Sequence, residues 1–283
     1  MQMRELPVPP VCGSSTAVVR GLRDGKAFER EDWVAQEVPL ALEYNGIAHA
    51  VMLATPADLE DFAVGFSRSE GIVDEVSQIY DFEAVEAAKG YTLSLQIAAS
   101  CMGRLKQQRR TLAGRTGCGL CGVESLEHAL RVPDPLPAGT QFSASTVSRA
   151  LASLRERQPL LGVTGATHAA AWCDADGSLA YVREDVGRHN ALDKLIGAML
   201  RARMPAGDGF MLISSRASYE MVQKAATAGV TVLAAVSGVT ALAIDVAQEA
   251  GLALLGFARG DDLCIYSHGE RIVLTATPWT TTT

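Results

Sequence analysis

Cys118 and Cys121 are the residues of this chain whose type and spacing are best suited to chemistry. They stand three positions apart in the stretch GRTGCGLCG at 114–122, which also contains four glycines. Residues 100–123 include no Asp or Glu but five cations, which are Arg104, Lys106, Arg109, Arg110 and Arg115. A free thiol has a pKa of about 8.5, and nearby cations raise the fraction of reactive thiolate. Because glycine also lets a partner approach closely, the stretch predicts a reactive sulfur loop.

Four functions remain open for this cysteine pair from its residues alone. The pair could be half of a structural zinc site, but zinc needs four ligands and the chain has no second CxxC pair. It could exchange a dithiol for a disulfide, although such motifs usually begin a helix after a strand. It could be chemically inert, which leaves the glycines and the missing acids without a reason. It could carry a persulfide, which agrees with a mobile, basic loop that holds a second thiol.

Zinc-dependent deaminase chemistry is excluded by the sequence. The signature of the zinc deaminases combines H-x-E with P-C-x-x-C. In this chain Gly117 precedes the first cysteine, and the single H-x-E, His268-Gly269-Glu270, follows the CxxC pair, whereas the signature places it before that pair. Because the signature is incomplete and out of order, we predict no metal site.

Two loops have the residue types of an anion-binding site. Residues 184–190 and 214–218 each lie between a predicted strand and a predicted helix. In α/β proteins such loops open onto helix N-termini and commonly bind phosphates. Ser214 and Arg216 suit that role, whereas helix capping with a surface salt bridge is the alternative for each loop. His168 is kept as a candidate, although a histidine in an apolar strand is more often a hydrogen-bonded core residue.

The N-terminal half must position the cysteine loop. Residues 1–36 are polar and predict an irregular arm on the surface, and residues 37–135 predict a smaller α+β region with the CxxC loop. Asn45-Gly46 between strand-like runs at 39–44 and 47–53 is a strong hairpin signal. The sequence Thr-Pro-Ala-Asp at 55–58 predicts the start of a helix that ends at Gly71. Alternation over 91–97 predicts a half-buried strand.

The C-terminal region, residues 140–283, follows a proline-rich linker at 132–139. Short apolar strands are predicted at 162–172, 179–183, 210–214, 230–236, 252–257 and 263–266. Helices are predicted at 145–157, 190–203, 219–228 and 241–250. This alternation predicts an α/β fold with a mainly parallel sheet and helices on both faces.

Composition limits the classes of partner. The 283 residues are 48% hydrophobic and 20% charged, which is normal for a soluble protein with a real core. The net charge of −7 argues against electrostatic binding to nucleic acid. No apolar stretch is long enough to span a membrane, and no signal-peptide pattern opens the chain. The other four cysteines are scattered singly, so we expect a cytoplasmic protein.

With these residues in view, the chain resembles the formate dehydrogenase accessory sulfurtransferase family (FdhD) from about residue 37 onward. The resemblance rests on GRTGCGLCG at 114–122, TGATHAAAW at 164–172, EDVGRHNALDKLIG at 184–197 and SSRASYEMVQKAA at 214–226. It implies a sulfurtransferase that takes persulfide sulfur from a cysteine desulfurase. The sulfur would go to the bis(molybdopterin guanine dinucleotide) molybdenum cofactor that a formate dehydrogenase needs. A non-catalytic chaperone for that cofactor is the alternative.

The same resemblance implies a fold and a set of site residues. The C-terminal domain is expected to be similar to cytidine deaminases without their zinc site, and the protein to be a homodimer. Cys118 matches the persulfide-bearing position and Cys121 the second cysteine. GDP is expected to bind as a partial mimic of the cofactor. The family's cofactor-binding segment corresponds to Phe257, Ala258, Arg259, Gly260, Asp261 and Asp262.

This segment departs from the family pattern at its end. Family members often have proline where Gly260 stands, and glycine and a basic residue in place of Asp261 and Asp262. Two carboxylates repel a pyrophosphate unless they bind guanine nitrogens or face away. A milder change is Ser267-His268-Gly269, where the family has Thr-His-Pro.

Overall fold

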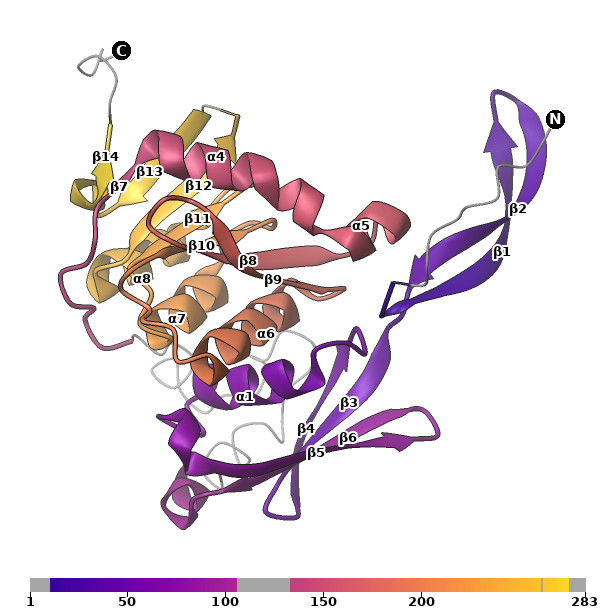
Figure 1. The fold of residues 1–283 in the computed structure, drawn as a ribbon, viewed down its shortest axis with the longest axis horizontal. Coiled ribbons are helices and arrows are strands. Elements are labelled where there is room, and N and C mark those ends of the chain that lie inside the picture. The colour runs from indigo at the N-terminus through magenta and orange to yellow at the C-terminus, as the bar shows by residue number, and fades with distance from the viewer. Residues whose placement is uncertain (1–10, 106–132, 261, 275–283) are drawn as a thin grey trace.

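The computed structural model describes residues 11–105, 133–260 and 262–274, and it stacks two sheets with helices between them (Figure 1). The N-terminal sheet has four strands in the order β4-β3-β6-β5. Their bounds are β3 Val38–Tyr44, β4 Ile47–Ala54, β5 Ile79–Ala87 and β6 Gly90–Ile97. Asn45 and Gly46 both have positive φ, as a two-residue hairpin turn requires. The predicted hairpin and the predicted strand at 91–97 are therefore confirmed.

Helix α1, Leu59–Ser69, packs on this sheet and begins later than the sequence predicted. Its N-cap residue is Asp58, whose φ is 52°. Thr55 does not cap the helix, because it is buried and forms hydrogen bonds with a distant part of the chain. The N–H of Thr55 donates to Asp185 at 3.0 Å, and its hydroxyl accepts from the N–H of Val186 at 3.2 Å. Such long-range bonds cannot be predicted from local sequence.

The C-terminal sheet has six strands in the order β13-β12-β11-β10-β8-β9. The expected mainly parallel sheet is wrong, because only the pairs β10–β11 and β11–β12 are parallel, whereas the pairs β8–β9, β8–β10 and β12–β13 are antiparallel. Tight turns join β8 to β9 and β12 to β13, and strands joined in this way must pair antiparallel. The bounds are β8 His168–Cys173, β9 Leu179–Asp185, β10 Phe210–Ile213, β11 Val232–Ala235, β12 Ala253–Arg259 and β13 Asp262–Ser267.

Helices cover both faces of this sheet, as predicted. Helix α4, Ala144–Leu154, packs on one face together with the short strand β7, Phe142–Ser143, which pairs with β14, Ile272–Val273. The other face carries α6 Arg188–Arg201, α7 Tyr219–Thr227 and α8 Ala241–Ala250. The strand predicted from residue 162 begins only at His168, because Pro159–Thr164 form a short helix, α5. In the described part of the chain, no helix has both the length and the apolar character needed to cross a membrane.

Helices α1 and α6 join the two halves through a close crossing. A Cβ atom at Gly65 would collide with the backbone carbonyl of Asp193, and one at Gly197 would collide with that of Asp61. Only glycine fits at either position, so the backbones can touch. Beside the crossing, the buried Asp61 carboxylate accepts from Arg183 at 2.8 Å and from Arg201 at 2.5 Å. The N-terminal sheet is thus fixed to the C-terminal one through a helix pair.

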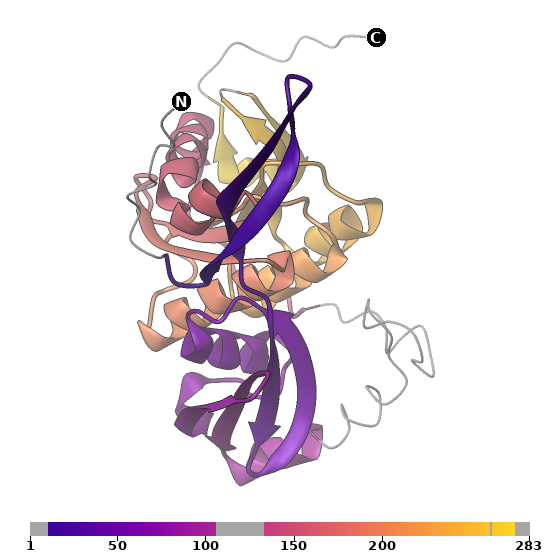
Figure 2. The ribbon, with the colours of Figure 1, turned by 90° about the vertical axis from the view of Figure 1, so that its right-hand side faces the viewer.

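Residues 14–35 form a two-stranded antiparallel ribbon that extends away from the body (Figures 1 and 2). Its strands are β1 Ser14–Arg23 and β2 Lys26–Ala35, joined by Asp24 and Gly25, both with positive φ. The expected irregular arm is wrong over these residues. Neither face of the ribbon is buried in a core, so its sequence lacks the apolar alternation by which strands are predicted.

Candidate functional site

The cysteine pair at 118 and 121 lies outside the described residues, together with most of the basic stretch around it. The flanking described residues are firmly placed: Leu105 is fully buried, and the N–H of Leu136 donates to the carbonyl of Ala250 at 2.8 Å. Arg104, the first cation of the stretch, pairs with Asp74 at 2.7 Å. Within the described ranges, no three His, Cys, Asp or Glu side chains are grouped so that they could hold a metal ion.

The predicted anion-binding residues lie along one edge of the C-terminal sheet, where β10, β11 and β12 end. Ser214 follows β10, and its N–H donates to the carbonyl of Ala169, next to His168 at the start of β8. The N–H of Phe257, near the end of β12, donates to the carbonyl of Ser237, which follows β11. Because β8 runs antiparallel to β10, its first residue reaches the same edge. The fold therefore brings the loops with His168, Ser214, Arg216 and Phe257 to one side.

These residues differ in how free they are to bind a ligand. The hydroxyl of Ser214 accepts the N–H of Ala169 at 2.8 Å, so it holds β8 in place. The side chain of Arg216 is exposed, and Ser215 is buried with its hydroxyl donating to the carbonyl of Arg216 at 3.0 Å. Arg216 is thus available to an incoming anion, whereas the Ser214 hydroxyl has a structural role in holding β8.

Phe257 is the most unusual residue of the segment 257–262. Its φ is 50°, a left-handed conformation that costs a bulky side chain on the order of 1–3 kcal/mol. The residue is 49% exposed, and its ring lies against Gly238. An exposed aromatic ring on a strained backbone at a strand end is typical of a ligand contact. It gives this edge a flat apolar surface.

The remaining described residues of the segment form the turn between β12 and β13. Ala258 is buried in the core, and the Nε of Arg259 donates to the carbonyl of Val236 at 3.1 Å. Gly260 has a φ of 58°, which explains why this chain has glycine there. Asp262 is exposed opposite Arg259, and Asp261 lies outside the described residues. Ala258 and Arg259 therefore support the turn.

The acids of the loop 184–190 are structural, which favours the helix-capping alternative for them. Glu184 accepts the first N–H groups of α5, from Leu160 at 2.9 Å and Leu161 at 2.8 Å. Asp185 is fully buried and pairs with the equally buried Lys194 at 2.7 Å. Lys194 also donates to the carbonyl of Thr55 at 2.9 Å. These acids therefore neutralise or cap neighbouring groups and do not face a ligand.

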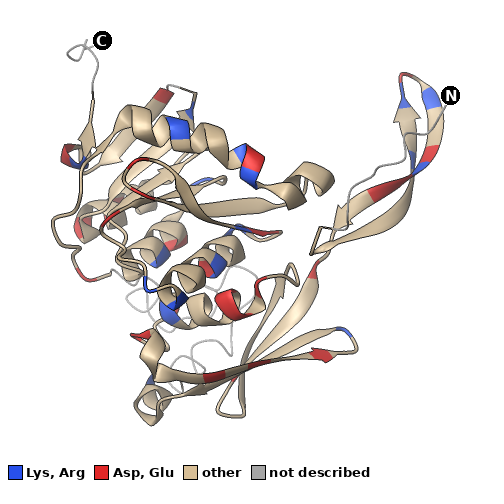
Figure 3. Cartoon of the chain, viewed as in Figure 1, with Lys and Arg blue, Asp and Glu red and all other residues tan. Residues whose placement is uncertain are grey.

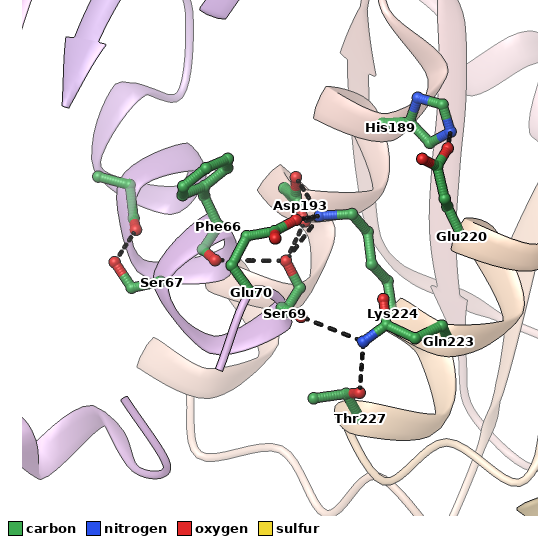
Figure 4. A network of polar contacts seen from close by, with 11 residues as sticks. Phe66, Ser67, Ser69, Glu70, His189, Asp193, Glu220, Gln223, Lys224 and Thr227 are labelled. Atoms are coloured by element: carbon green, nitrogen blue, oxygen red, sulfur yellow. Dashed lines mark hydrogen bonds and ion pairs between the residues drawn. The ribbon is translucent and has the colours of Figure 1, made fainter. Parts of the chain in front are cut away.

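The same loop contributes Arg188 and His189, which sequence analysis did not single out. His189, in the first turn of α6, pairs with Glu220, in the first turn of α7, at 2.7 Å (Figure 4). The His189 ring holds the pKa of the Glu220 carboxyl below its usual range. Burial lowers the pKa of His168, and the charges of Arg188 and His189 add to this effect. The only sequence signal for them was their place in a strand-to-helix loop.

The family model for the FdhD/NarQ family matches residues 35–273. A relative from Variovorax paradoxus named sulfur carrier protein FdhD is 55% identical over 96% of this chain and 98% of its own length. Another, from Bordetella petrii and with the same name, is 51% identical over 95% of this chain and 97% of its own.

A solved structure of a formate dehydrogenase accessory protein from Desulfotalea psychrophila has a TM-score of 0.73. It is 22% identical and covers 92% of this chain and 99% of its own, so it shares the fold. The chain belongs to the FdhD/NarQ family.

Proposed function

We propose that this chain carries sulfur as a persulfide on Cys118 and delivers it to the bis(molybdopterin guanine dinucleotide) cofactor for a formate dehydrogenase. The observation that carries the proposal is identity of 51–55% over nearly the whole chain with proteins named sulfur carrier protein FdhD. The two cysteines in an acid-free, basic stretch supply the chemistry. We place the reaction in the cytoplasm, where thiols stay reduced.

The proposed relay needs two thiols and a reductant. The Cys118 thiolate attacks the outer sulfur of a persulfide on a cysteine desulfurase. The cysteine of the desulfurase leaves as a thiolate, and Cys118 now holds the persulfide. Cys121 then attacks the Sγ of Cys118, and the outer sulfur leaves with the bonding electron pair as hydrosulfide. The pair becomes a disulfide, which a cellular dithiol reduces again. The metal of the bound cofactor takes up the released sulfur as a ligand.

A non-catalytic cofactor chaperone is the competing function. In that case the thiols would shield or ligate the cofactor, and no sulfur would pass through them. The two functions differ in one measurement, which is transfer of ³⁵S from labelled cysteine through the desulfurase to the cofactor. A carrier acquires the label on its own chain before the cofactor does. A chaperone leaves its own chain unlabelled.

The strand-end edge supports binding of the guanine nucleotide part of the cofactor. The exposed ring of Phe257 offers a stacking surface for a planar heterocycle, and the exposed Arg216 offers a cation for a phosphate. The acids Glu184 and Asp185 are occupied by structural partners, so they add little repulsion. Asp262 is exposed at the start of β13, opposite Arg259. These residues fit a nucleotide with negative phosphates.

Replacing Phe257 by alanine is expected to weaken GDP binding by about 5- to 150-fold, because stacking on an aromatic ring is worth about 1–3 kcal/mol. Calorimetric titration of GDP measures the change. Tyr80→Ala is the matched control, since Tyr80 is 70% exposed on β5 of the other sheet. The control should bind GDP like the wild type. Equal affinity in Phe257→Ala and the wild type would remove the ring from the site.

We also propose that the protein is a homodimer in which the ribbon of each copy lies on the body of the other. An isolated two-stranded ribbon is at best marginally stable in water. Val18 and Leu22 on the ribbon are 66% and 76% exposed, and Val51 and Leu53 on the edge strand β4 are 65% and 56% exposed. Figure 3 shows charges of both signs along the ribbon. Ten-residue strands span about 34 Å, so two exchanged ribbons bury on the order of 1,200 Å², the lower limit of a stable interface.

The double substitution Val18→Glu, Leu22→Glu is expected to convert the dimer into a monomer, because it places two acids in an apolar contact. Sedimentation velocity measures the state. Tyr80→Glu, Val85→Glu makes the same exchange on β5, where both side chains are also exposed, and should remain a dimer. Hydrogen exchange adds an independent test, since amides of residues 14–35 should become more protected as the concentration rises. A monomeric wild type would contradict the proposed dimer with swapped ribbons. Amide protection that does not depend on protein concentration would contradict it as well.

A further inference from the structure

A pocket of about 380 Å³ lies where the two halves of the chain meet, at the opposite end of α7 from the strand-end edge. Its walls are the last residues of α1, the last residues of α7 and the segment 133–136. Helix α1 ends at Ser69 and α7 at Thr227, so the carboxyl ends of both helices line the pocket. Small-molecule sites have volumes of about 300–1,000 Å³. The pocket is thus large enough for a small ligand and separate from the proposed nucleotide surface.

Arg68, in the last turn of α1, lines this pocket as a half-buried cation. Its guanidinium forms no hydrogen bond and no ion pair with any residue in the described part of the chain. Burial lowers the pKa of Arg68, and the charge of Asp74 offsets this only in part, because Asp74 is paired with Arg104 at 2.7 Å. A half-buried guanidinium is normally matched by a carboxylate. Arg68 therefore has room for a carboxylate from a ligand.

The other walls of the pocket carry acceptors. Asp134 is exposed in the segment 133–136, and among the described residues its carboxylate pairs neither with Arg68 nor with another cation. The amide nitrogen of Gln223 donates to the carbonyl of Ser69 at 3.3 Å and to the hydroxyl of Thr227 at 3.0 Å (Figure 4). Because both N–H groups of this amide are used, its Oε1 is left to accept. The negative ends of two helix dipoles add to these acceptors, so this side of the pocket suits a cation.

A cation and an anion thus line one pocket without pairing with each other, and a ligand that carries both charges can neutralise both. We propose that the pocket binds a small zwitterion of the amino acid or dipeptide class, with its carboxylate on Arg68 and its ammonium group on Asp134 and the Oε1 of Gln223. A guanidinium binds a carboxylate through two parallel hydrogen bonds, and an ammonium group has three donors for the acceptors opposite. Leu136 and Ala226 add apolar wall for the rest of the ligand.

Calorimetric titration of the full chain with two zwitterions and their derivatives tests this site. The zwitterions are leucine and leucyl-glycine. The N-acetyl form of each lacks the ammonium group, and the amide form of each lacks the carboxylate. At least one zwitterion is expected to bind the wild type about tenfold or more tightly than its N-acetyl and amide forms do, because each derivative loses one charge-assisted contact.

Two variants assign the charges of the ligand to their partners. Arg68→Gln is expected to weaken the zwitterion by about tenfold or more and to leave the amide form, which has no carboxylate, at its wild-type affinity. Asp134→Asn should also weaken the zwitterion, but should spare the N-acetyl form, which has no ammonium group. Arg155→Gln is the matched control, because Arg155 is exposed in the short helix Arg155–Arg157. The control should bind every probe like the wild type.

A loss that follows the charge removed in each variant supports the inference. A wild type that binds neither zwitterion overturns it, and so does zwitterion affinity that both variants retain. Equal weakening of zwitterion, N-acetyl and amide forms in both variants would reflect a disturbed pocket and would overturn the assigned contacts. GDP affinity should be unchanged in Arg68→Gln, since the pocket and the strand-end edge lie at opposite ends of α7. Failure of this inference therefore leaves the proposed cofactor binding standing.

Discussion

Replacement of Cys118 by alanine is expected to abolish both persulfide formation and activation of formate dehydrogenase. The proposed relay has no other thiol that the desulfurase loads first, so no sulfur should reach the cofactor. The fold should persist, because a glycine-rich, basic stretch contributes little to a core. Intact-mass analysis after incubation with a cysteine desulfurase and cysteine measures a gain of one sulfur, about 32 Da, in the wild type. The Cys118→Ala chain should show none.

Two further variants make the assignment specific. Cys121→Ala should still gain the sulfur but deliver it more slowly, because Cys121 acts in the second step of the proposed relay. Cys264→Ala is the control for nonspecific thiol labelling, since Cys264 is a free, exposed cysteine far along the chain on β13. It should load and deliver like the wild type. A full-yield sulfur adduct on Cys118→Ala would refute the assignment of Cys118.

Elements whose signals are local could be predicted from this sequence. The Asn45-Gly46 hairpin follows from two residues that tolerate positive φ, and helices such as α1 and α6 follow from apolar spacing against a core. The relative direction of neighbouring strands could not be predicted in this way. Apolar runs such as Phe210–Ile213 and Ala253–Arg259 indicate burial, but they do not tell whether a neighbour runs parallel or antiparallel. That direction depends on the connections, and the short β8–β9 and β12–β13 turns make the outer pairs antiparallel.

The strand-end position of the candidate loops follows from chain order, whereas the ligand that they bind stays a prediction. The structure brings the loops with His168, Ser214, Arg216 and Phe257 to one side of the sheet. Which side chain is free depends on contacts far apart in sequence. The hydroxyl of Ser214 is bound to the N–H of Ala169, whereas the buried Nε of Arg188 has no hydrogen-bond partner among the described residues. The positive φ of Phe257 was equally hidden, because no residue preference signals it.

The largest expected loss of stability comes from Lys224→Met. Lys224 and Asp193 are both buried, and the Nζ of Lys224 lies 2.9 Å from Asp193, 3.0 Å from Glu70 and 2.8 Å from the hydroxyl of Ser69 (Figure 4). Burial alone would lower the pKa of Lys224, but the two carboxylates prevail and raise it, so the amine stays charged. Removing it leaves Asp193 buried and uncompensated. Breaking such a pair costs about 3–5 kcal/mol. Urea unfolding followed by tryptophan fluorescence measures the loss.

The loss of stability in Lys224→Met should depend on the pH and on the charge of Asp193. Burial raises the pKa of Asp193, so the folded state of Lys224→Met takes up a proton more readily than the unfolded state does. Its deficit relative to the wild type should therefore shrink as the pH falls from 7 towards that raised pKa, since protonation removes the uncompensated charge. Asp193→Asn added to Lys224→Met should recover part of the loss at pH 7.

The control for this pair is Glu29→Gln, which breaks the exposed pair of Arg20 and Glu29 on the ribbon. It should cost less than about 1 kcal/mol, because water already solvates both groups. The contrast matters for function, because Lys224 on α7 binds Ser69 and Glu70 at the end of α1 and so holds the N-terminal half to the C-terminal half. If Lys224→Met cost no more than Glu29→Gln, the Lys224 network would not be what joins the two halves. The glycine crossing of α1 and α6 and the Asp61 ion pairs beside it would then hold them.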